Sequence, residues 1–394
     1  MNTTQAAARL ILKTGKIESL NRFHPWVFSG AIKRIEGDPV DGDLVELFDN
    51  HDRFLALGQY GTGSIAARII AWEPYIIDHE FWKNKFETAW SYRMQLNLLN
   101  SDNNVFRLIH GEADGMPGLI VDFYNGVAVM EFHAAGMERI SNDLAKALAE
   151  ATDGNIKTIV GKSKANAGNN ATLLFGKAPQ MPYEIIENSK KFNVNWDDGQ
   201  KTGFFIDQRE NRQMLGHYSK NRNVLNMFCY TGGFSVYALS GGATKVVSVD
   251  SSSKAIELCR QNLELNGFST DKNKCIESDA LDYLKAMPKN EYDIIVLDPP
   301  AYAKRVDTRH NAIQGYKRLN AEALAKIKSG GFLFTYSCSQ VVDRNHFNGA
   351  VTAAAIAAER KVRVVAQLSQ APCHGHTIFH PEGFYLKGLT LYVE

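Results

Sequence analysis

Two short segments combine residue types that could do covalent chemistry, TYSCS at 335–339 and DPPAYAK at 298–304. Cys338 stands between two serines and is one of five cysteines. Because these five form no C-x-x-C pair and no zinc-type Cys/His spacing, neither a zinc site nor a disulfide framework is expected. A reduced thiol can act as a nucleophile once ionised, and Cys338 is the candidate. The alternatives are an inert core thiol and Cys229, which we expect instead to line a cofactor pocket.

A glycine turn and an acid mark a candidate cofactor site. Gly232 and Gly233 follow an apolar run at 224–229 and open a helix, and Asp250 ends the next apolar run. In a doubly wound sheet these positions lie at adjacent strand ends, where ligands bind, and the carboxylate could accept both hydroxyls of a ribose. The usual G-x-G is reduced here to Y-T-G, so simple helix packing is the alternative at this step.

Three further segments favour a cofactor at this edge. Asp279 follows the third apolar run, as an acid that contacts adenine would, and Asp298 ends the fourth. Upstream, GQKTGFFIDQRENR at 199–212 mixes polar and aromatic residues, and a helix cap at Asp207 would explain only part of it. A nicotinamide cofactor fits less well, since the last two apolar runs predict an antiparallel pair that is foreign to the parallel dehydrogenase sheet.

The elements that would position these residues begin after Asn221. The apolar runs are VLNMFC, KVVSVD, KCIES, DIIVLD, GFLFTYS, KVRVVAQL and YLKGLTLYV, with amphipathic helices between the first six. This alternation predicts a mostly parallel, doubly wound α/β sheet of the Rossmann-like type, with helices on both faces and an antiparallel pair at one edge.

The upstream half follows other patterns. From Ala8 to about Trp72, short apolar runs broken by turn residues predict a small β-barrel, and the spacing over 78–99 predicts a helix leaving it. Residues 105–195 then suggest a mixed α+β module. The chain has 394 residues, which is more than a single hydrophobic core usually organises. We therefore predict three domains at 1–76, 77–195 and 196–394.

Composition limits the partners. The chain is 44% apolar and 22% charged, as packed globular proteins are, and its formal net charge is only +1. The start of the chain does not have the pattern of a signal peptide, and no run approaches the length of a membrane span, so a cytoplasmic protein is expected. A nucleic-acid surface must therefore come from a local charge excess.

Such excesses occur at residues 1–34 and just after the DPP turn. Phosphate contacts combined with aromatic stacking would suit RNA, although charge runs are often only solvated surface. The candidate substrate contacts are Pro299, Pro300, Tyr302, Lys304, Arg305, Arg309, Lys317, Arg22, Lys33 and Arg34.

Over nearly its full length the chain resembles the ribosomal RNA large-subunit 5-methylcytosine methyltransferases related to methyltransferase I. RFHPWVFSGAI at 22–32 resembles the start of their PUA domain, and GEADGMPGLIVDFY at 111–124 resembles their central domain. The successive catalytic-domain motifs are KTGFFIDQRENR, FCYTGGFSVYAL, VVSVD, DPPAYAK, TYSCS and HPEGFYLKG.

The resemblance implies a PUA-like RNA-binding domain and a class I methyltransferase domain with S-adenosylmethionine as cofactor. It implies large-subunit ribosomal RNA as the partner and no membrane, and it leaves a homodimer open. The cofactor-binding residues that we expect are Thr202, Gly203, Phe204, Phe205, Asp207, Gln208, Arg209, Phe228, Tyr230, Thr231, Gly232, Gly233, Phe234, Asp250, Ser251, Asp279, Ala280 and Asp298.

It also implies a role for Cys338 as nucleophile. Cytosine C5 is too poor a nucleophile to take the methyl group directly, so a thiolate must first add to C6. Asp298 could hydrogen-bond N3 or the exocyclic amine and stabilise charge as the thiolate adds. Glu382 in HPEGFY is a candidate base for the C5 proton, with a surface turn as its alternative. In many RNA 5-methylcytosine enzymes a second cysteine follows the Asp-Pro; here Pro300 takes that place.

Two other functions remain open. An N-methyltransferase acting on guanine or on an exocyclic amine could use Asp-Pro-Pro, but in the usual motif the aromatic residue follows the prolines directly, whereas Ala301 intervenes here. Such an enzyme would need no nucleophilic cysteine. A noncatalytic RNA-binding factor for ribosome assembly is the second alternative.

Overall fold

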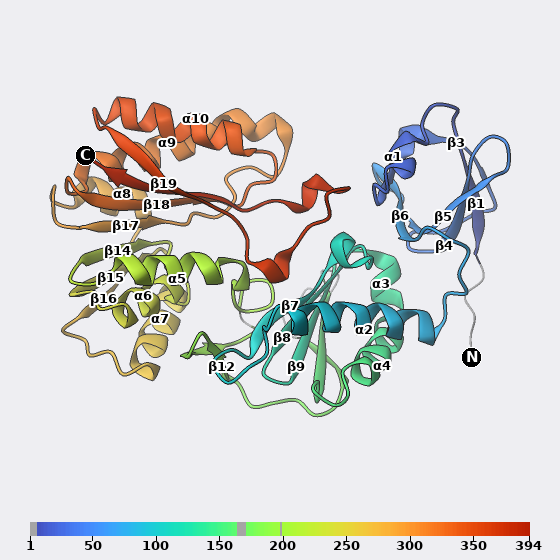
Figure 1. Ribbon diagram of the computed structural model, residues 1–394, viewed down its shortest axis with the longest axis horizontal. Coiled ribbons are helices and arrows are strands. Elements are labelled where there is room, and N and C mark those ends of the chain that lie inside the picture. Colours follow the sequence, from blue (N-terminus) through green and yellow to red (C-terminus); the bar gives the residue numbers. More distant parts are fainter. Residues whose placement is uncertain (1–5, 164–170, 198) are drawn as a thin grey trace. The chain divides into compact units, whose positions relative to one another are not determined.

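The computed structural model describes residues 6–163, 171–197 and 199–394 (Figure 1). The chain forms two compact units. Unit 1 contains Met1–Ile186, Val194–Phe204 and Pro372–Gly383, and unit 2 contains Glu187–Asn193, Phe205–Ala371 and Phe384–Glu394. The division into three domains stays a prediction.

Unit 2 is built on one seven-stranded sheet with the order β16-β15-β14-β17-β18-β20-β19. The first five of these strands are parallel, and β20 runs antiparallel to both of its neighbours. The predicted Rossmann-like sheet with an antiparallel pair at one edge is therefore confirmed. Its strands are β14 (Asn223–Met227), β15 (Lys245–Asp250), β16 (Asn273–Glu277), β17 (Ile294–Leu297), β18 (Gly331–Ser337), β19 (Val362–Leu368) and β20 (Lys387–Val393).

Helices lie on both faces of this sheet (Figure 1). One core joins β14, β15, β17, β18 and β20 to α8, α9 and α10 through fully buried side chains such as Leu225, Leu297 and Phe347. These strands read as continuous apolar runs because both of their faces are covered. The helices of unit 2 are α5 (Arg209–Tyr218), α6 (Gly233–Ser240), α7 (Ser253–Leu265), α8 (Ala280–Ala286), α9 (Arg309–Lys326) and α10 (Arg344–Ala357).

Unit 1 begins with a six-stranded sheet in the order β2-β6-β5-β4-β1-β3. Leu10, Val27, Val45, Ala56 and Ala67, from five of its strands, pack in one core, as expected for a small rolled sheet. The strands are β1 (Ala8–Leu12), β2 (Trp26–Phe28), β3 (Ile32–Glu36), β4 (Leu44–Phe48), β5 (Phe54–Tyr60) and β6 (Ile65–Ala71), and α1 (Glu18–Asn21) precedes β2.

The predicted linker helix is α2 (His79–Gln95), which Asp78 caps by accepting a hydrogen bond from the Phe81 amide. A five-stranded sheet follows in the order β11-β10-β9-β8-β7. Its strands are β7 (Val105–His110), β8 (Leu119–Tyr124), β9 (Val127–Phe132), β10 (Thr158–Ser163) and β11 (Thr172–Phe175), with α3 (Ala135–Arg139) and α4 (Ser141–Ala151) between β9 and β10. β12 (Tyr183–Glu187) and β13 (Lys190–Val194) form a separate two-stranded sheet. No described helix is long and apolar enough to cross a membrane.

Candidate active site

The turn between β14 and α6 has an unusual backbone. Phe228 and Tyr230 have φ values of 58° and 44°, and Gly232 has a φ of 77°. A Cβ at Gly232 would lie 2.6 Å from Sγ of Cys259, so this position requires glycine both for its conformation and for the close approach of α7. Left-handed conformations at residues other than glycine are costly and cluster at ligand sites. The turn is therefore shaped for more than connecting a strand to a helix.

Asp250 holds this turn from the end of β15. Its Oδ2 accepts a 3.0 Å hydrogen bond from the amide of Tyr230, and its Oδ1 accepts one of 3.0 Å from the amide of Ser252. Each carboxylate oxygen can accept a second bond, so capacity for ribose hydroxyls remains. Ser251 is exposed beside it.

Asp279 stands at the end of β16 and caps α8. Its Oδ1 accepts hydrogen bonds of 2.8 and 3.1 Å from the amides of Leu281 and Asp282. Ala280 is the first residue of that helix. Capping is a structural role for Asp279, and it leaves Oδ2 for a ligand.

Asp207 and Gln208 are neighbours in the sequence and make separate buried polar contacts, of which those of Gln208 reach Asp298 directly after β17. Asp207 does not cap α5, whose N-cap is Gln208. Its Oδ2 accepts a 2.6 Å hydrogen bond from the hydroxyl of Tyr385. Gln208 donates through Nε2 to Oδ1 of Asp298 at 3.0 Å, and Asn211 donates to Oε1 of Gln208 at 2.6 Å. The sheet edge thus carries a fixed row of acceptors at the ends of neighbouring strands.

One acceptor in this row is unused. Asp207 is 7% exposed, and its Oδ1 has no hydrogen-bond partner among the described residues. Burying such an atom costs free energy unless a ligand or water satisfies it. A carboxylate oxygen of this kind suits the amino group of an amino-acid moiety, which S-adenosylmethionine carries.

The aromatic residues predicted for the cofactor lie around the β14 turn. Phe205 meets Tyr230 edge to face, with ring centroids 5.2 Å apart. Phe234 is buried and packs on Tyr336 at 5.6 Å. The carbonyl of Thr231 accepts a 2.8 Å bond from Asn262, which fixes it to α7.

Other predicted cofactor residues have structural contacts. Thr202, Gly203 and Phe204 belong to unit 1, where Thr202 donates a 2.5 Å hydrogen bond to the buried Asp122 of β8. Gly203 has a φ of 103°, and a Cβ there would lie 2.8 Å from Val194. Arg209 donates to Glu210 at the start of α5, and Gly233 is buried under Arg212.

Cys338 directly follows β18, beside the DPP turn that follows β17. Its Sγ lies 4.0 Å from the carbonyl oxygen of Pro299. The half-buried thiol is the first residue after the strand, and Ser339 behind it donates a 2.6 Å bond to the carbonyl of Ala303. The two segments singled out for chemistry therefore meet at one edge. Cys229 is buried. The Sγ atom of Cys275 lies 3.7 Å from the Sγ atom of Cys259.

Lys387 is a residue of this site that the sequence analysis did not assign. It is 2% exposed, and its Nζ donates two 2.6 Å hydrogen bonds, to the carbonyls of Ser339 and Tyr385. Burial lowers the pKa of Lys387 to about 8, and the Cys338 sulfur, when charged, opposes this shift. A signal was present in the sequence, since a lysine within the apolar run YLKGLTLYV is otherwise hard to explain.

Glu382, the candidate base, does not belong to the same unit of the chain as Cys338. It belongs to unit 1, and its Oε2 lies 3.3 Å from Nε2 of His24. Its proposed role as a base stays a prediction.

The predicted substrate residues differ in their surroundings. Tyr302 is exposed and packs against the buried Tyr316 in a tilted arrangement, with ring centroids 4.7 Å apart. Lys304 and Pro300 are exposed, whereas Arg305 pairs with Asp307. Arg309 and Lys317 are half-buried on α9. In unit 1, Arg22 and Lys33 are exposed, and Arg34 donates to Glu36 at 2.8 Å.

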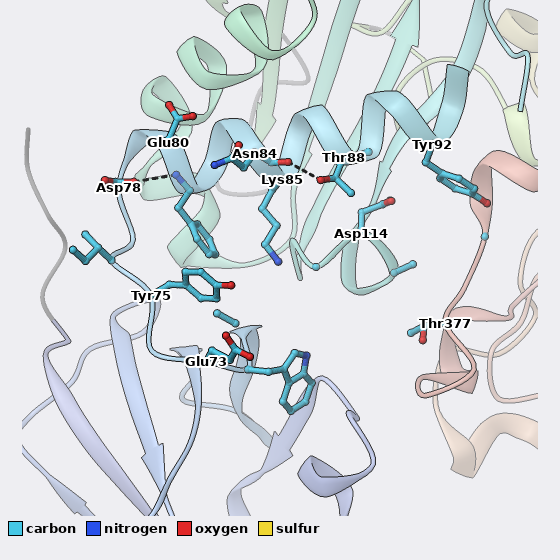
Figure 2. Close-up of a pocket in the computed structure, with 18 of the residues that line it drawn as sticks. Glu73, Tyr75, Asp78, Glu80, Asn84, Lys85, Thr88, Tyr92, Asp114 and Thr377 are labelled. Carbon is cyan, nitrogen blue, oxygen red and sulfur yellow. Dashed lines mark hydrogen bonds between the residues drawn. The ribbon is translucent and has the colours of Figure 1, made fainter. Parts of the chain in front are cut away.

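A cavity of about 1180 Å³ lies in unit 1, and Figure 2 shows Lys85 projecting from α2 into it. Burial lowers the pKa of Lys85. The acidic residues Glu73, Asp78, Glu80 and Asp114 dominate the charged lining. Such a lining does not suit phosphates, so the cavity adds nothing to the candidate RNA contacts.

Comparison with known proteins gives the context of this site. A family model described as S-adenosylmethionine-dependent methyltransferase matches residues 107–365, and one described as a PUA-like domain matches residues 10–72. A ribosomal RNA large subunit methyltransferase I from Aeromonas salmonicida is 37% identical over 97% of this chain and 98% of its own. One from Shigella boydii is 35% identical over 98% and 99%.

Solved structures agree in fold. A putative SAM-dependent methyltransferase from Streptococcus mutans superposes with a TM-score of 0.85 at 21% identity, over 97% of this chain and 99% of that one. A putative methyltransferase complexed with SAH gives a TM-score of 0.86 at the same identity and coverage. The unused oxygen of Asp207 and the glycine turn fit the expected cofactor, S-adenosylmethionine. The chain belongs to the S-adenosylmethionine-dependent methyltransferases that carry an N-terminal PUA-like domain, the family of the ribosomal RNA large subunit methyltransferases I.

Proposed function

We propose that this chain methylates C5 of a cytosine in large-subunit ribosomal RNA and uses Cys338 as a covalent nucleophile. The observation that carries the proposal is the 4.0 Å approach of Sγ of Cys338 to the carbonyl of Pro299, which brings the thiol beside Asp298. An N-methyltransferase would have no use for a thiol at that place. The relatives are ribosomal RNA large subunit methyltransferases I, which supports large-subunit ribosomal RNA as the substrate class.

The chemistry follows from the weakness of cytosine C5 as a nucleophile. The Cys338 thiolate adds to C6 and forms a sulfur–carbon bond, which moves the electron pair of the C5–C6 double bond toward C5 and N3. Bound S-adenosylmethionine supplies an electrophilic methyl group. C5 would take that methyl group as the methyl–sulfonium bond breaks, which leaves S-adenosylhomocysteine. C5 then loses its proton to a base, and the bond between C6 and the Cys338 sulfur breaks to restore the ring and the thiolate.

Asp298 is the residue that we expect to bind the cytosine ring. Gln208 holds one of its oxygens at 3.0 Å, which fixes the carboxyl group at the end of β17. A carboxyl fixed in this way can bind N3 or the exocyclic amine of cytosine and stabilise charge as the thiolate adds. Cofactor binding alone is the other role open to it.

Lys387 would favour the thiolate form of Cys338. The buried ammonium group is held by two carbonyls and lies within electrostatic range of the sulfur. A nearby positive charge stabilises a thiolate relative to a thiol. This assigns Lys387 a positioning and electrostatic role rather than a covalent one.

The RNA around the target base would be bound by residues other than Cys338 and Asp298. The target base has to leave its stack, which costs a few kcal/mol, so unpaired cytosines should be preferred. Tyr302 offers an exposed ring and Lys304 an exposed charge beside the DPP turn. Arg22 and Lys33 of the PUA-like domain would add phosphate contacts.

The test uses RNA that contains 5-fluorocytosine. After methyl transfer to such a base, fluorine cannot leave as a proton does, so the enzyme should stay bound to the RNA through Cys338. Mass spectrometry of the digested adduct locates the attached residue. Cys338→Ala should give no adduct and no methyl transfer, with S-adenosylhomocysteine binding nearly unchanged. Cys275→Ala is the matched control and should behave as wild type.

Three outcomes would contradict the proposal. An adduct on Cys229 would move the nucleophile. A Cys338→Ala protein that methylates at near the wild-type rate would favour methylation of guanine or of an exocyclic amine. Tight RNA binding without turnover on any precursor ribosomal RNA would favour a noncatalytic assembly factor.

A further inference from the structure

Three side chains in unit 1 form a cluster that the methyl-transfer site does not use. They are His24, His380 and Glu382, and one ligand atom from each lies within 4.8 Å of the other two. Oε2 of Glu382 is 3.3 Å from Nε2 of His24 and 3.7 Å from Nε2 of His380. Two imidazole nitrogens and one carboxylate oxygen at this spacing resemble the donor set of a three-ligand zinc site.

His380 provides an independent sign that something binds there. It is 4% exposed, and its Nε2 is buried without a hydrogen-bond partner in the described part of the chain. Buried nitrogens of this kind are rare because leaving one unsatisfied costs about 1–3 kcal/mol. This nitrogen faces the same carboxylate oxygen as Nε2 of His24.

His24 is held in an orientation that suits a metal ligand. Its Nδ1 lies 3.4 Å from the carbonyl oxygen of Trp26 and 3.2 Å from the amide of the same residue. In the first arrangement Nδ1 carries the proton, which leaves the Nε2 lone pair for a metal; a backbone carbonyl is a common partner for a metal-bound histidine. In the second, Nε2 carries the proton and can donate to Glu382.

The loop that carries His380 and Glu382 is fixed in unit 1 at several points. Arg93 donates a 3.1 Å bond to the carbonyl of Cys373, and the hydroxyl of Tyr92 donates one of 3.4 Å to the carbonyl of Pro372. Phe379 packs against Phe23, with ring centroids 5.5 Å apart. The three donor groups are thus held together by other contacts, so binding would need little further ordering.

The ring of His380 is also held in place by an aromatic neighbour. Trp26, which packs 4.4 Å from the ring of His380, is anchored by a 2.8 Å bond to Glu112.

We propose that His24, His380 and Glu382 bind one Zn²⁺ ion through Nε2, Nε2 and a carboxylate oxygen, with the remaining coordination position taken by water. Sequence spacing did not predict this site, because His24 and Glu382 are 358 residues apart. The ion would clamp the loop Pro372–Gly383 to the residues before β2. If Glu382 binds the ion, it is not the base that removes the C5 proton.

The test uses the full chain after treatment with a chelator. Zn²⁺ is added in competition with a chromophoric chelator, and one tight site per chain is expected. Glu382→Gln, at an exposed position, should weaken binding at least tenfold without affecting the fold, and His24→Gln should do the same. His79→Gln is the matched control, because His79 forms an exposed pair with Glu150 at 2.8 Å, and it should leave affinity unchanged.

Co²⁺ distinguishes this site from the thiols. Bound Co²⁺ should give visible absorption bands of a four- or five-coordinate nitrogen and oxygen site, without the sulfur charge-transfer band that a cysteine ligand would produce. These Co²⁺ absorption bands should disappear in Glu382→Gln. A sulfur band, equal Zn²⁺ affinity in Glu382→Gln and wild type, or the absence of a site tighter than that of exposed histidines would each overturn the proposal.

Discussion

Lys387 of β20 is the pairing partner of Ser337, the last residue of β18. The next residue after Ser337 is Cys338, so a buried lysine lies across from the residue that precedes the proposed nucleophile. The ammonium group is held by two carbonyls, one of them from Ser339, so the charge is fixed against the TYSCS segment. A cation in a dry setting acts on a neighbouring thiol more strongly than it would in water. The pairing of Lys387 with Ser337 therefore links β20 to the proposed nucleophile.

Replacement of Lys387 by Met should slow methyl transfer at pH 7 on the order of tenfold. Without the nearby positive charge, a roughly tenfold smaller fraction of Cys338 would be present as the thiolate. The pKa of Lys387 is lowered to about 8, so its charge is present below that pH and lost above it. Below pH 8 the charge increases the thiolate fraction of Cys338, so the wild type should be faster than Lys387→Met there, and the two rates should converge as the pH rises above 8 and the charge is lost. The rate of Cys338 alkylation by iodoacetamide measures the same effect directly. Lys328→Met, which removes an ion pair with Asp293, is the control and should leave both rates unchanged.

Gly232→Ala should weaken S-adenosylhomocysteine binding and lower stability by about 1–3 kcal/mol, since the new Cβ meets Sγ of Cys259 at 2.6 Å on a left-handed backbone. Gly267→Ala separates the two causes, because Gly267 has a φ of 75° and open space around it. Calorimetry and urea unfolding should show a smaller loss of stability at Gly267 and no loss of affinity. Equal effects at both positions would mean that the close approach to α7 is unimportant.

Asp207→Asn should weaken S-adenosylhomocysteine binding by about 10- to 100-fold, the range for losing a hydrogen bond to a charged group. The expectation rests on the buried, unused Oδ1, which we assign to the amino group of the cofactor. 5′-Methylthioadenosine lacks that amino group, so its affinity should be the same for the variant and the wild type. A parallel loss for both ligands would indicate a general disturbance of the network with Tyr385.

Lys304→Gln should reduce the salt dependence of RNA binding, because each phosphate contact adds about one to the slope of log affinity against log salt. Arg305→Gln is the comparison: Arg305 already pairs with Asp307, so its contribution to the slope should be smaller. Fluorescence anisotropy over a series of KCl concentrations measures both. Identical slopes for wild type and Lys304→Gln would remove this segment from the RNA surface.

The parallel strands of unit 2 could be predicted from the sequence because they are buried on both faces and appear as unbroken apolar runs, several of which are followed by candidate site residues. Cys338 and Asp298 were placed at one edge by that rule alone, and the contact at Pro299 agrees with it. The position of β20 between β18 and β19 could not be read in the same way. Strand order depends on tertiary packing, so the partner of Lys387 was invisible in the sequence.

The charge pattern of the N-terminal residues shows a second limit. The charge excess at residues 1–34 predicted a basic surface. β1 pairs with β3, however, so Arg9 lies opposite Glu36 and binds it at 3.1 Å. Cross-strand pairing neutralises part of the predicted basic surface, and only the strand register reveals it.

The position of β20 within the sheet has a consequence for the timing of synthesis. β19 is made before β20 but has β20 as its sheet partner, and β18 also lacks that neighbour until β20 has been made. A nascent chain emerges from its amino end, so the PUA-like domain can fold well before the sheet of unit 2 is complete. Lys387 lies in β20, so it takes its place only when this strand pairs with β18. An unfinished polypeptide that lacks β20 would thus have a folded PUA-like domain but no lysine beside the proposed nucleophile.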